Sequence, residues 1–288
     1  MSAQLHDARQ CALGEGPLWH PERGQFFWFD ILGQRLLSQQ DGAPQHWQFD
    51  EIVSAAGWID RDTLLIASET ALFTFNLETG SRATLTPLEA DNPTTRSNDG
   101  RADPAGGFWI GTMGKSAEAG AGAIYRFYKG ELRQLYPDIT IPNSICFAPD
   151  GSTAYFADTL TGLIKRAPLD AQGWPSAAPE IFLDLRDQGL NPDGSVTDAA
   201  GNLWNAQWGA SRVAGYTPDG TPLETYAFPG RHTSCPAFGG PSLSDMYCTT
   251  AQELLSPEIL AAEPANGQTF VTPTTRTGWP ESCRLVVR

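Results

Sequence analysis

The sequence of 288 residues predicts an all-β chain folded as a single six-bladed β-propeller over residues 1–288. A turn rich in Gly, Asp and Pro, followed by a short aromatic or β-branched strand, recurs along the whole chain. The copies begin roughly 40 to 50 residues apart, which is the length of a four-stranded propeller blade. The composition, with 29 Gly, 22 Pro and 9 Trp, suits many short strands joined by tight turns.

The recurring strands occupy equivalent places in six successive units. They cover residues 26–30, 64–69, 108–113, 154–159, 203–208 and 246–251. Each follows an inner segment that ends in a turn, as residues 17–20 do before residues 21–24. Two outer strands complete a unit, for example 71–76 with 82–86, or 123–128 with 132–136. The sequence thus predicts four strands in each blade.

The two ends of the chain and one late segment carry further expectations. Residues 7–12 and 283–288 are both strand-like, and their pairing would close the ring and protect its edge strands. Residues 257–267 predict a loop with a helical turn, inserted in the last blade.

A β-sandwich is the alternative fold, because it also spaces turn signals regularly. Turn signals in a sandwich recur about every 8 to 12 residues. A longer unit of roughly 44 residues recurs here, which favours the propeller.

The chain is acidic, with a formal net charge of −14. This charge argues against binding nucleic acid through phosphate neutralisation and against binding anionic membranes. The N-terminus lacks a basic region followed by an apolar run, and no apolar stretch approaches the length of a membrane span. We therefore expect a cytoplasmic protein. The five cysteines show no CxxC spacing, so we expect buried thiols, Cys146 and Cys248 among them, and no disulfide framework.

Inner-strand residues in the same register converge at one mouth of a propeller channel. Counting back six residues from the turn position of each blade selects Glu15, Ala55, Asn98, Asn143, Asp193 and Cys235. Four of these carry a side-chain oxygen, which needs a partner in a channel wall of backbone and apolar surface. The sequence therefore predicts a polar site at this mouth.

An ordinary turn is the other reading of these residues, because Asn, Asp and Gly favour turn geometry. Three Pro-Asp-Gly tripeptides allow a comparison. Those at Asp150 and Asp219 stand at ordinary hairpin turns, whereas Asp193 is followed by its own strand and then by a separate turn at 198–201. We therefore place Asp193 at the start of an inner strand.

The chemistry of the selected residues points to a metal ion. Carboxylate and amide oxygens, without sulfur or imidazole, suit Ca²⁺, Mg²⁺ or Mn²⁺ better than a structural zinc site. Three protein ligands would leave coordination positions for water and substrate, as in a catalytic metal site. We predict one divalent ion in the channel.

Five short motifs carry a resemblance to a known family. They are GEGPLW at 14–19, RSNDG at 96–100, WIGTM at 109–113, IPNS at 141–144 and PDGS at 192–195. Along nearly its whole length the chain resembles the gluconolactonase, regucalcin (senescence marker protein) and luciferin-regenerating enzyme family. The resemblance implies a six-bladed propeller that binds a divalent metal and hydrolyses sugar lactones to aldonic acids.

The resemblance also implies a role for each matching position. Glu15, Asn143 and Asp193 match the family's metal ligands, and Asp193 matches its general base. Arg96 and Asn98 match the residues that contact the substrate.

Further expectations concern the lid, the ion and the partners. Glu118 matches a substrate-contacting glutamate of the family's lid loop, which is short here and rich in Gly and Ala. Trp208 is a candidate for an apolar wall of the substrate pocket. Ca²⁺ is the expected ion, with Zn²⁺, Mn²⁺, Mg²⁺ and Fe²⁺ as alternatives. The expected partner is a small-molecule sugar lactone, and the chain is expected to be a monomer or a weak homo-oligomer.

Two other functions stay open. One is a related hydrolase of organophosphates or aryl esters with the same metal pocket, and the other is a noncatalytic calcium-binding protein. Arg96, Asn98 and Glu118 favour a polyhydroxylated substrate over the first alternative. Arg96 and Asn98 also argue against the second, because metal binding alone does not require them.

Overall fold

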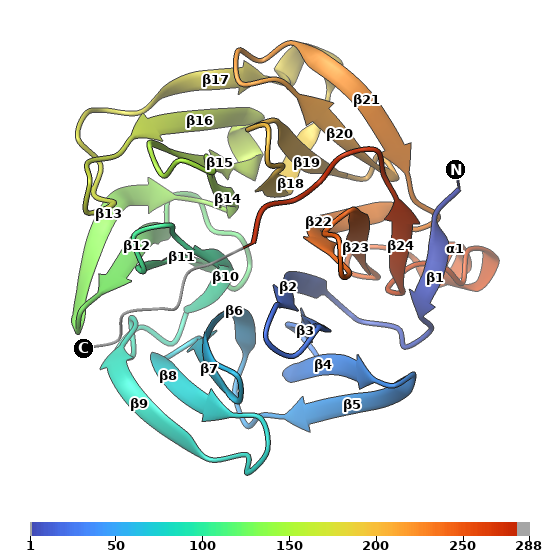
Figure 1. The fold of residues 1–288 in the computed structure, drawn as a ribbon, viewed down its shortest axis with the longest axis horizontal. Coiled ribbons are helices and arrows are strands. Elements are labelled where there is room, and N and C mark those ends of the chain that lie inside the picture. Colours follow the sequence, from blue (N-terminus) through green and yellow to red (C-terminus); the bar gives the residue numbers. More distant parts are fainter. Residues whose placement is uncertain (1, 281–288) are drawn as a thin grey trace.

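The computed structural model describes residues 2–280 and shows six four-stranded antiparallel sheets around a central channel (Figure 1). In five of these sheets the strands follow in chain order, and in the remaining sheet one edge strand comes from the N-terminal segment. The fold is therefore a six-bladed β-propeller, as predicted, and the sandwich alternative is wrong.

The blades are numbered in chain order, and the strands of each blade are given from the channel outward. Blade 1 contains β2 (Gly14–His20), β3 (Gln25–Asp30), β4 (Arg35–Gln40) and β5 (Ala43–Gln48). Blade 2 contains β6 (Val53–Asp60), β7 (Thr63–Ser68), β8 (Ala71–Asn76) and β9 (Arg82–Pro87). Blade 3 contains β10 (Thr95–Ala102), β11 (Phe108–Gly114), β12 (Gly122–Tyr128) and β13 (Glu131–Ile139).

The second half of the ring repeats this arrangement. Blade 4 contains β14 (Pro142–Phe147), β15 (Thr153–Asp158), β16 (Leu163–Pro168) and β17 (Glu180–Asp184). Blade 5 contains β18 (Asn191–Thr197), β19 (Leu203–Trp208), β20 (Arg212–Tyr216) and β21 (Pro222–Ala227). Blade 6 contains β22 (His232–Gly239), β23 (Asp245–Ala251), β24 (Thr269–Pro273) and the N-terminal β1 (Gln4–Asp7). The six recurring strands of the sequence are the second strands of these blades, to within one residue at each end.

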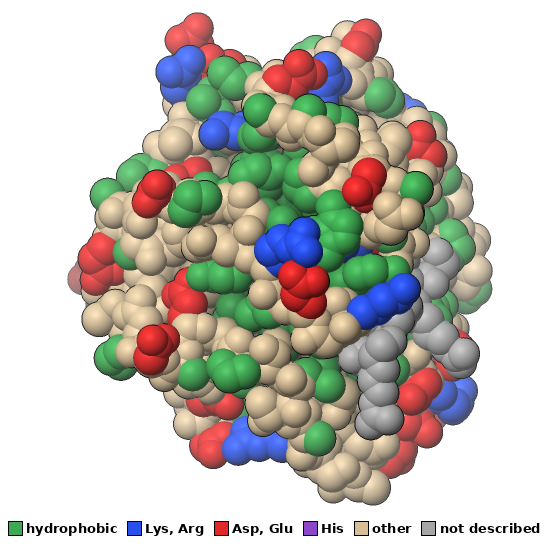
Figure 2. All heavy atoms as spheres, turned by 90° about the vertical axis from the view of Figure 1, so that its left-hand side faces the viewer, with side chains coloured by type: hydrophobic (Ala, Val, Ile, Leu, Met, Phe, Trp, Pro, Cys, Tyr) green, Lys and Arg blue, Asp and Glu red, His purple; other side chains and the backbone are tan. Residues whose placement is uncertain are grey.

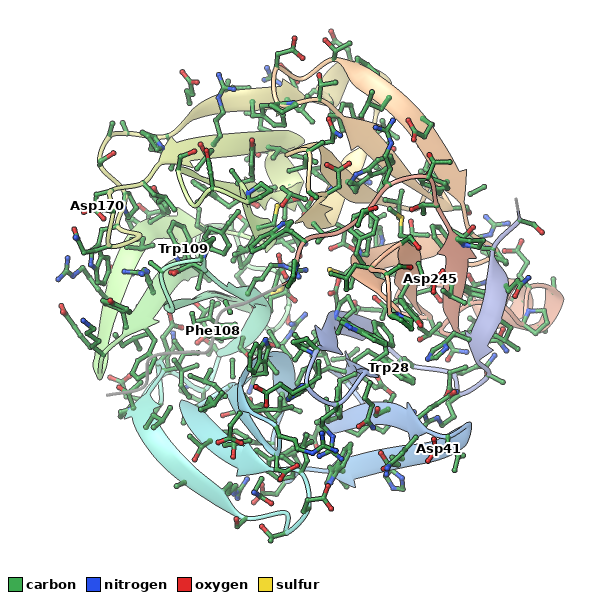
Figure 3. The ribbon with its side chains drawn as sticks, in the orientation of Figure 1. Trp28, Asp41, Phe108, Trp109, Asp170 and Asp245 are labelled. Atoms are coloured by element: carbon green, nitrogen blue, oxygen red, sulfur yellow. The ribbon has the colours of Figure 1, made fainter. Side chains whose placement is uncertain are left out.

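The second strands consist of consecutive hydrophobic residues because both faces of a blade are covered by the neighbouring blades. Phe108 and Trp109 are neighbours in β11 and are both fully buried (Figure 3). Successive side chains of a strand point to opposite faces of its sheet. Phe108 accordingly packs with Leu65 of blade 2, whereas Trp109 packs with Phe147 of blade 4.

Within residues 2–280 the buried hydrophobic side chains form six clusters, one between each pair of neighbouring blades. Between blades 6 and 1 the rings of Phe26 and Tyr247 stack with centroids 4.3 Å apart. Cys146 and Cys248 are buried, as predicted, and Cys283 lies outside the described residues. Hydrophobic packing between blades thus holds the ring together.

The surface contributes less to stability than these clusters. On the side of the ring in Figure 2, several basic side chains lie next to acidic ones. Ion pairs on the outer strands include Arg133 with Glu131 at 2.9 Å and Arg166 with Glu180 at 2.7 Å. Exposed pairs of this kind are worth about 0 to 1 kcal/mol each.

The ring closes through the N-terminal segment, beside β24 in Figure 1. Gln4 pairs with Val271, and Leu5 pairs with Phe270. The prediction that residues 7–12 form the closing strand is wrong, since β1 ends at Asp7. The Asp7 carboxylate accepts hydrogen bonds from the backbone N–H and the side chain of Arg9, just beyond the end of the strand. The other predicted closing segment, 283–288, lies outside the described residues.

The predicted helical turn in the last blade is confirmed by α1 (Pro257–Ala262). The Ser256 side chain accepts the backbone N–H of Ile259, and Pro257 occupies the first turn. The short 3-10 helices η1 (Thr159–Thr161) and η2 (Arg186–Gln188) follow strands of blade 4. Among residues 2–280, no helix combines the length and apolar character needed to cross a membrane. The cytoplasmic location and the oligomeric state stay predictions.

A buried aspartate organises the turn between the first two strands of blade 3. Asp103 Oδ1 accepts the backbone N–H groups of Ala105 at 2.9 Å and Gly107 at 3.0 Å. Its Oδ2 accepts Nε of Arg126 in β12 at 2.6 Å, and both side chains are fully buried. Asp103 thus ties the turn to the third strand of its blade.

Asp103→Ala is expected to lower the free energy of unfolding by about 3 to 5 kcal/mol, because it leaves the buried Arg126 guanidinium without its carboxylate. Urea unfolding followed by circular dichroism measures the change. Asp150→Ala, at an exposed turn of blade 4, is the control and is expected to cost under about 1 kcal/mol. Equal losses in the two variants would contradict this explanation.

Candidate active site

At one irregularity of the ladder in each blade, the inner strand has one residue more than the second strand with which it pairs. Glu15 pairs with Phe29, and the next paired residue is Leu18, opposite Phe27. The same irregularity follows Val53 in β6, Ser97 in β10, Asn143 in β14, Pro192 in β18 and Thr233 in β22. β-Bulges re-aim side chains and are common next to active sites.

Because of the bulges, the residues selected by counting back from the turns do not all occupy the same position in the ladder. Glu15 and Asn143 are the last paired residues before their bulges, whereas Asn98 and Asp193 lie inside theirs. The four positions therefore differ by one residue in the ladder. All four nevertheless line one cavity.

This cavity has a volume of about 420 Å³ and opens at one mouth of the channel. Five of the six predicted site residues line it, namely Glu15, Arg96, Asn98, Asn143 and Asp193. Apolar side chains complete the wall, namely Leu13, Met113, Ile141, Leu160, Trp208 and Leu254. A mostly apolar wall with a few convergent polar groups is typical of a small-molecule site.

A larger groove of about 720 Å³ lies over the turns of blades 4 and 5. Its charged side chains are Asp150, Arg166 and Glu180, and none of them is buried. The smaller cavity is the candidate active site, because it gathers buried groups whose charges interact.

A chain of hydrogen bonds joins the amides of the site across three blades. Asn98 Nδ2 donates to Asn143 Oδ1 at 3.2 Å and to Pro142 O at 3.0 Å. Asn143 Nδ2 donates to Thr159 Oγ1 at 2.8 Å, and this hydroxyl donates to Pro192 O at 2.7 Å. Arg96 Nη1 donates to Asn98 Oδ1 at 2.8 Å. These bonds fix which atom of each amide is the oxygen.

Three buried carboxyl groups of the site have raised pKa values. Burial and the charge of Asp99 raise the pKa of Glu15 to about 8. Burial, together with the charges of Glu15 and Asp99, raises the pKa of Asp193 well above its usual range. Burial raises the pKa of Asp99 to about 6. A cation bound among these groups would favour their ionised forms.

Asp99 and Arg101 belong to this charged region and were not predicted as site residues. The Asp99 carboxylate accepts the backbone N–H of Ile145 at 2.7 Å. Arg101 reaches across the channel and donates to Ile145 O at 3.2 Å and Ser195 O at 3.3 Å. Its charge partly offsets the effect of burial on the pKa of Asp99. The available signal was a run of charged and amide residues in a predicted inner strand, since such residues are seldom fully buried.

The donor set suits a hard cation. Among residues 2–280, no three His, Cys, Asp or Glu side chains are grouped so that they could hold a metal ion by themselves. Glu15, Asn143 and Asp193 instead offer two carboxylates and one amide oxygen at one cavity wall. Oxygen ligands of this kind are the ones that Ca²⁺ and Mg²⁺ prefer. The three residues therefore fit the predicted ion, whose binding stays a prediction.

Glu118 does not line the cavity. Its side chain is exposed, and Oε2 accepts the backbone N–H of Ser116 at 3.1 Å within the same short loop. Lys115, Ser116 and Ala117 supply the rim at this place, and Lys115 Nζ pairs with Glu69 at 2.5 Å. A contact between Glu118 and the substrate stays a prediction.

Glu253 and His232 were missed, although both take part in the site. Glu253 lines the cavity from the second position after the end of β23. The His232 ring stacks on Trp208 with centroids 4.1 Å apart and holds that wall residue in place. The register count followed the inner strands alone. Extending it to the one or two residues that follow the second strands would have found Glu253, since Lys115 and Thr159 also line the cavity just after their strands.

Fold and site together define a six-bladed propeller with an acidic, amide-bearing cavity at one mouth of its channel. The chain belongs to the SMP-30/Gluconolactonase/LRE-like family, whose model matches residues 13–252. This confirms the family resemblance drawn from the motifs.

Relatives of the chain include proteins that are named as enzymes. The L-arabinolactonase of Azospirillum brasilense is 36% identical, over 96% of this chain and 95% of its own length. The 6-deoxy-6-sulfogluconolactonase of Pseudomonas putida is 33% identical, over 90% of each chain. The crystal structure of a calcium-binding protein, regucalcin, from Agrobacterium tumefaciens has a TM-score of 0.95 and 42% identity, covering 96% of this chain and 95% of the other.

Proposed function

We propose that this chain is a sugar lactonase, which opens a sugar lactone by hydrolysis to the aldonic acid. The observation that carries the proposal is the convergence of the proposed metal ligands and the Arg96–Asn98 pair on one cavity. The names of the relatives in Azospirillum brasilense and Pseudomonas putida support the same reaction.

Glu15, Asn143 and Asp193 would hold one divalent ion, with Ca²⁺ as the proposed species. The calcium-binding regucalcin of similar fold supports this choice, and Zn²⁺, Mn²⁺, Mg²⁺ and Fe²⁺ are the alternatives. When bound, such an ion polarises a carbonyl and lowers the pKa of water.

Asp193 is the proposed general base. The lactone carbonyl becomes an oxyanion when water adds, and Asp193 takes up the proton that the water loses. Burial and the nearby carboxylates raise the pKa of Asp193 in the metal-free protein, and a bound cation would favour its ionised form, which is the form that accepts a proton. Its position in the bulge of β18 supports this role, because the side chain faces the cavity.

Arg96 and Asn98 are proposed to orient the substrate. Within residues 2–280 the Arg96 side chain donates only through Nη1, to Ser97 O at 3.0 Å and to Asn98 Oδ1. Nε and Nη2 are therefore available for substrate oxygens. The Trp208 ring, stacked on His232, offers an apolar surface to the sugar ring.

A substrate panel tests the proposal. Acid release above the spontaneous rate would be measured for hexono- and pentonolactones with each candidate metal. Paraoxon and phenyl acetate provide the organophosphate and aryl-ester arms. Preference for either ester would favour the related hydrolase, and metal binding without any turnover would favour the noncatalytic calcium-binding protein.

Arg96→Ala is expected to lower kcat/KM for the preferred lactone by about 10- to 100-fold, the range of one lost charged hydrogen bond. Metal affinity, measured by calorimetry, is expected to stay within about twofold, because arginine cannot ligate a cation. Arg186→Ala, at an exposed arginine paired with Asp184, is the control and should leave both values unchanged. Parallel loss of metal and activity would show that Arg96 supports the site structurally.

A further inference from the structure

Glu253 presents a carboxylate without a partner in the cavity wall. It is half-buried, and among residues 2–280 its side chain accepts no hydrogen bond and forms no ion pair. Burial raises its pKa above the usual range, and the charge of Arg96 opposes that rise. A partly desolvated carboxylate is unfavourable unless donors satisfy its oxygens. The Glu253 carboxylate can therefore accept hydrogen bonds from a ligand in the cavity.

The backbone of Glu253 is held in place, so its side chain starts from a defined position. Its N–H donates to Ala12 O at 2.9 Å, and its carbonyl accepts Nδ1 of His232 at 2.9 Å. His232 in turn stacks on Trp208, which lines the same cavity. The carboxylate thus belongs to the same fixed wall as the proposed apolar surface.

Arg96 and Glu253 stand on opposite sides of the cavity. Arg96 lies in β10 of blade 3, and Glu253 follows β23 of blade 6, across the ring in Figure 1. The charge of Glu253 opposes the lowering of the Arg96 pKa by burial, so the two groups attract each other. Within residues 2–280 the two side chains form no ion pair with each other, and both line the same cavity, so a ligand there could contact both.

We propose that Glu253 is a specificity residue that accepts hydrogen bonds from hydroxyl groups of the lactone, while Arg96 donates from the opposite wall. The inference rests on the proposed lactonase function and defines its substrate class as lactones with free ring or side-chain hydroxyl groups. A site built to hydrogen-bond a hydroxyl discriminates strongly against analogues that lack it, because its own polar groups are then left unpaired.

The test compares two lactones of the same ring size, D-glucono-1,5-lactone and δ-valerolactone, which has no hydroxyl groups. Glu253→Gln is expected to lower kcat/KM for the hydroxylated lactone by about 10- to 100-fold and for δ-valerolactone by under about twofold. Glu258→Gln, at an exposed residue of α1, is the matched control and should change neither. Thermal unfolding of both variants confirms that they are folded.

A binding measurement separates this inference from the proposed function. Calorimetry with 1,5-anhydro-D-glucitol, which has the ring hydroxyls and no carbonyl, is expected to show binding weakened about tenfold or more by Glu253→Gln. If the wild type binds this ring, Glu253→Gln weakens that binding and no lactone is hydrolysed, then the proposed function fails and the hydroxyl contact of Glu253 stands. Equal loss for both lactones, or no loss for either, overturns the inference alone. Neither binding nor hydrolysis by the wild type overturns both.

Discussion

Asp193→Asn is expected to lower lactone turnover by a factor on the order of 10² or more. The amide keeps one neutral oxygen for a cation, but it can neither accept the proton of the attacking water nor balance the charge of the ion. Some metal affinity should therefore remain while hydrolysis is largely lost. Initial rates of acid release, measured at saturating metal, give the loss in kcat.

Two other aspartates in the same Pro-Asp-Gly context serve as controls. The Asp150 carboxylate accepts the backbone N–H of Ser152 at 2.9 Å, and Asp219 accepts that of Thr221 at 3.2 Å, both at exposed turns. Asparagine keeps an acceptor oxygen for such a turn. Asp150→Asn and Asp219→Asn are expected to change stability by under about 0.5 kcal/mol and to leave activity unchanged.

The three variants distinguish a site residue from a turn residue. Wild-type activity in all three would mean that Asp193 is not the base. Loss of activity in all three together with thermal stability would mean that these aspartates act through folding. The proposed role requires that Asp193→Asn alone is inactive and that it unfolds near the wild-type temperature.

Exhaustive chelation is expected to reduce lactone hydrolysis to the spontaneous rate. Without a cation, the raised pKa of Glu15 and Asp193 keeps these groups protonated to higher pH than usual, and the carbonyl is not polarised. Addition of Ca²⁺, Mn²⁺ or Zn²⁺ should restore activity at differing rates. The measurement is acid release before chelation, after chelation and after each addition.

The far-ultraviolet circular dichroism of the chelated protein is expected to stay that of a β-protein. Glu15, Asn143 and Asp193 come from three blades, but the strands of each blade pair with one another, and hydrophobic clusters join the blades. Unfolding on chelation would make the ion structural. Hydrolysis that continues after chelation would contradict the role of the metal.

The strand pattern of the propeller could be predicted because it depends on local properties. The second strands were found to within one residue, since aromatic and β-branched runs between turn residues indicate buried strands wherever the chain folds. The closing strand could not be placed in this way. β1 pairs with β24 more than 250 residues away, and it ends at Asp7, where the predicted strand-like segment begins.

The metal-ligand candidates were also within reach of the sequence, because every inner strand repeats the same relation between a turn and the channel mouth. Glu15, Asn143 and Asp193 could be selected by counting, even though a bulge shifts Asp193 by one position. Bulges follow from pairing between strands and leave no clear mark in the residue pattern.

The sequence by itself therefore determined the six blades, the family and the residues that converge on the channel mouth, because these follow from a repeated local pattern. Only the tertiary structure decided that Arg101 reaches across the channel beside Asp99 and that Glu253 faces Arg96 from the opposite blade. It also decided that Glu118 remains in its own loop, outside the cavity wall. The physical reason is that such contacts depend on how blades far apart in the chain approach one another and on where side chains from neighbouring strands end.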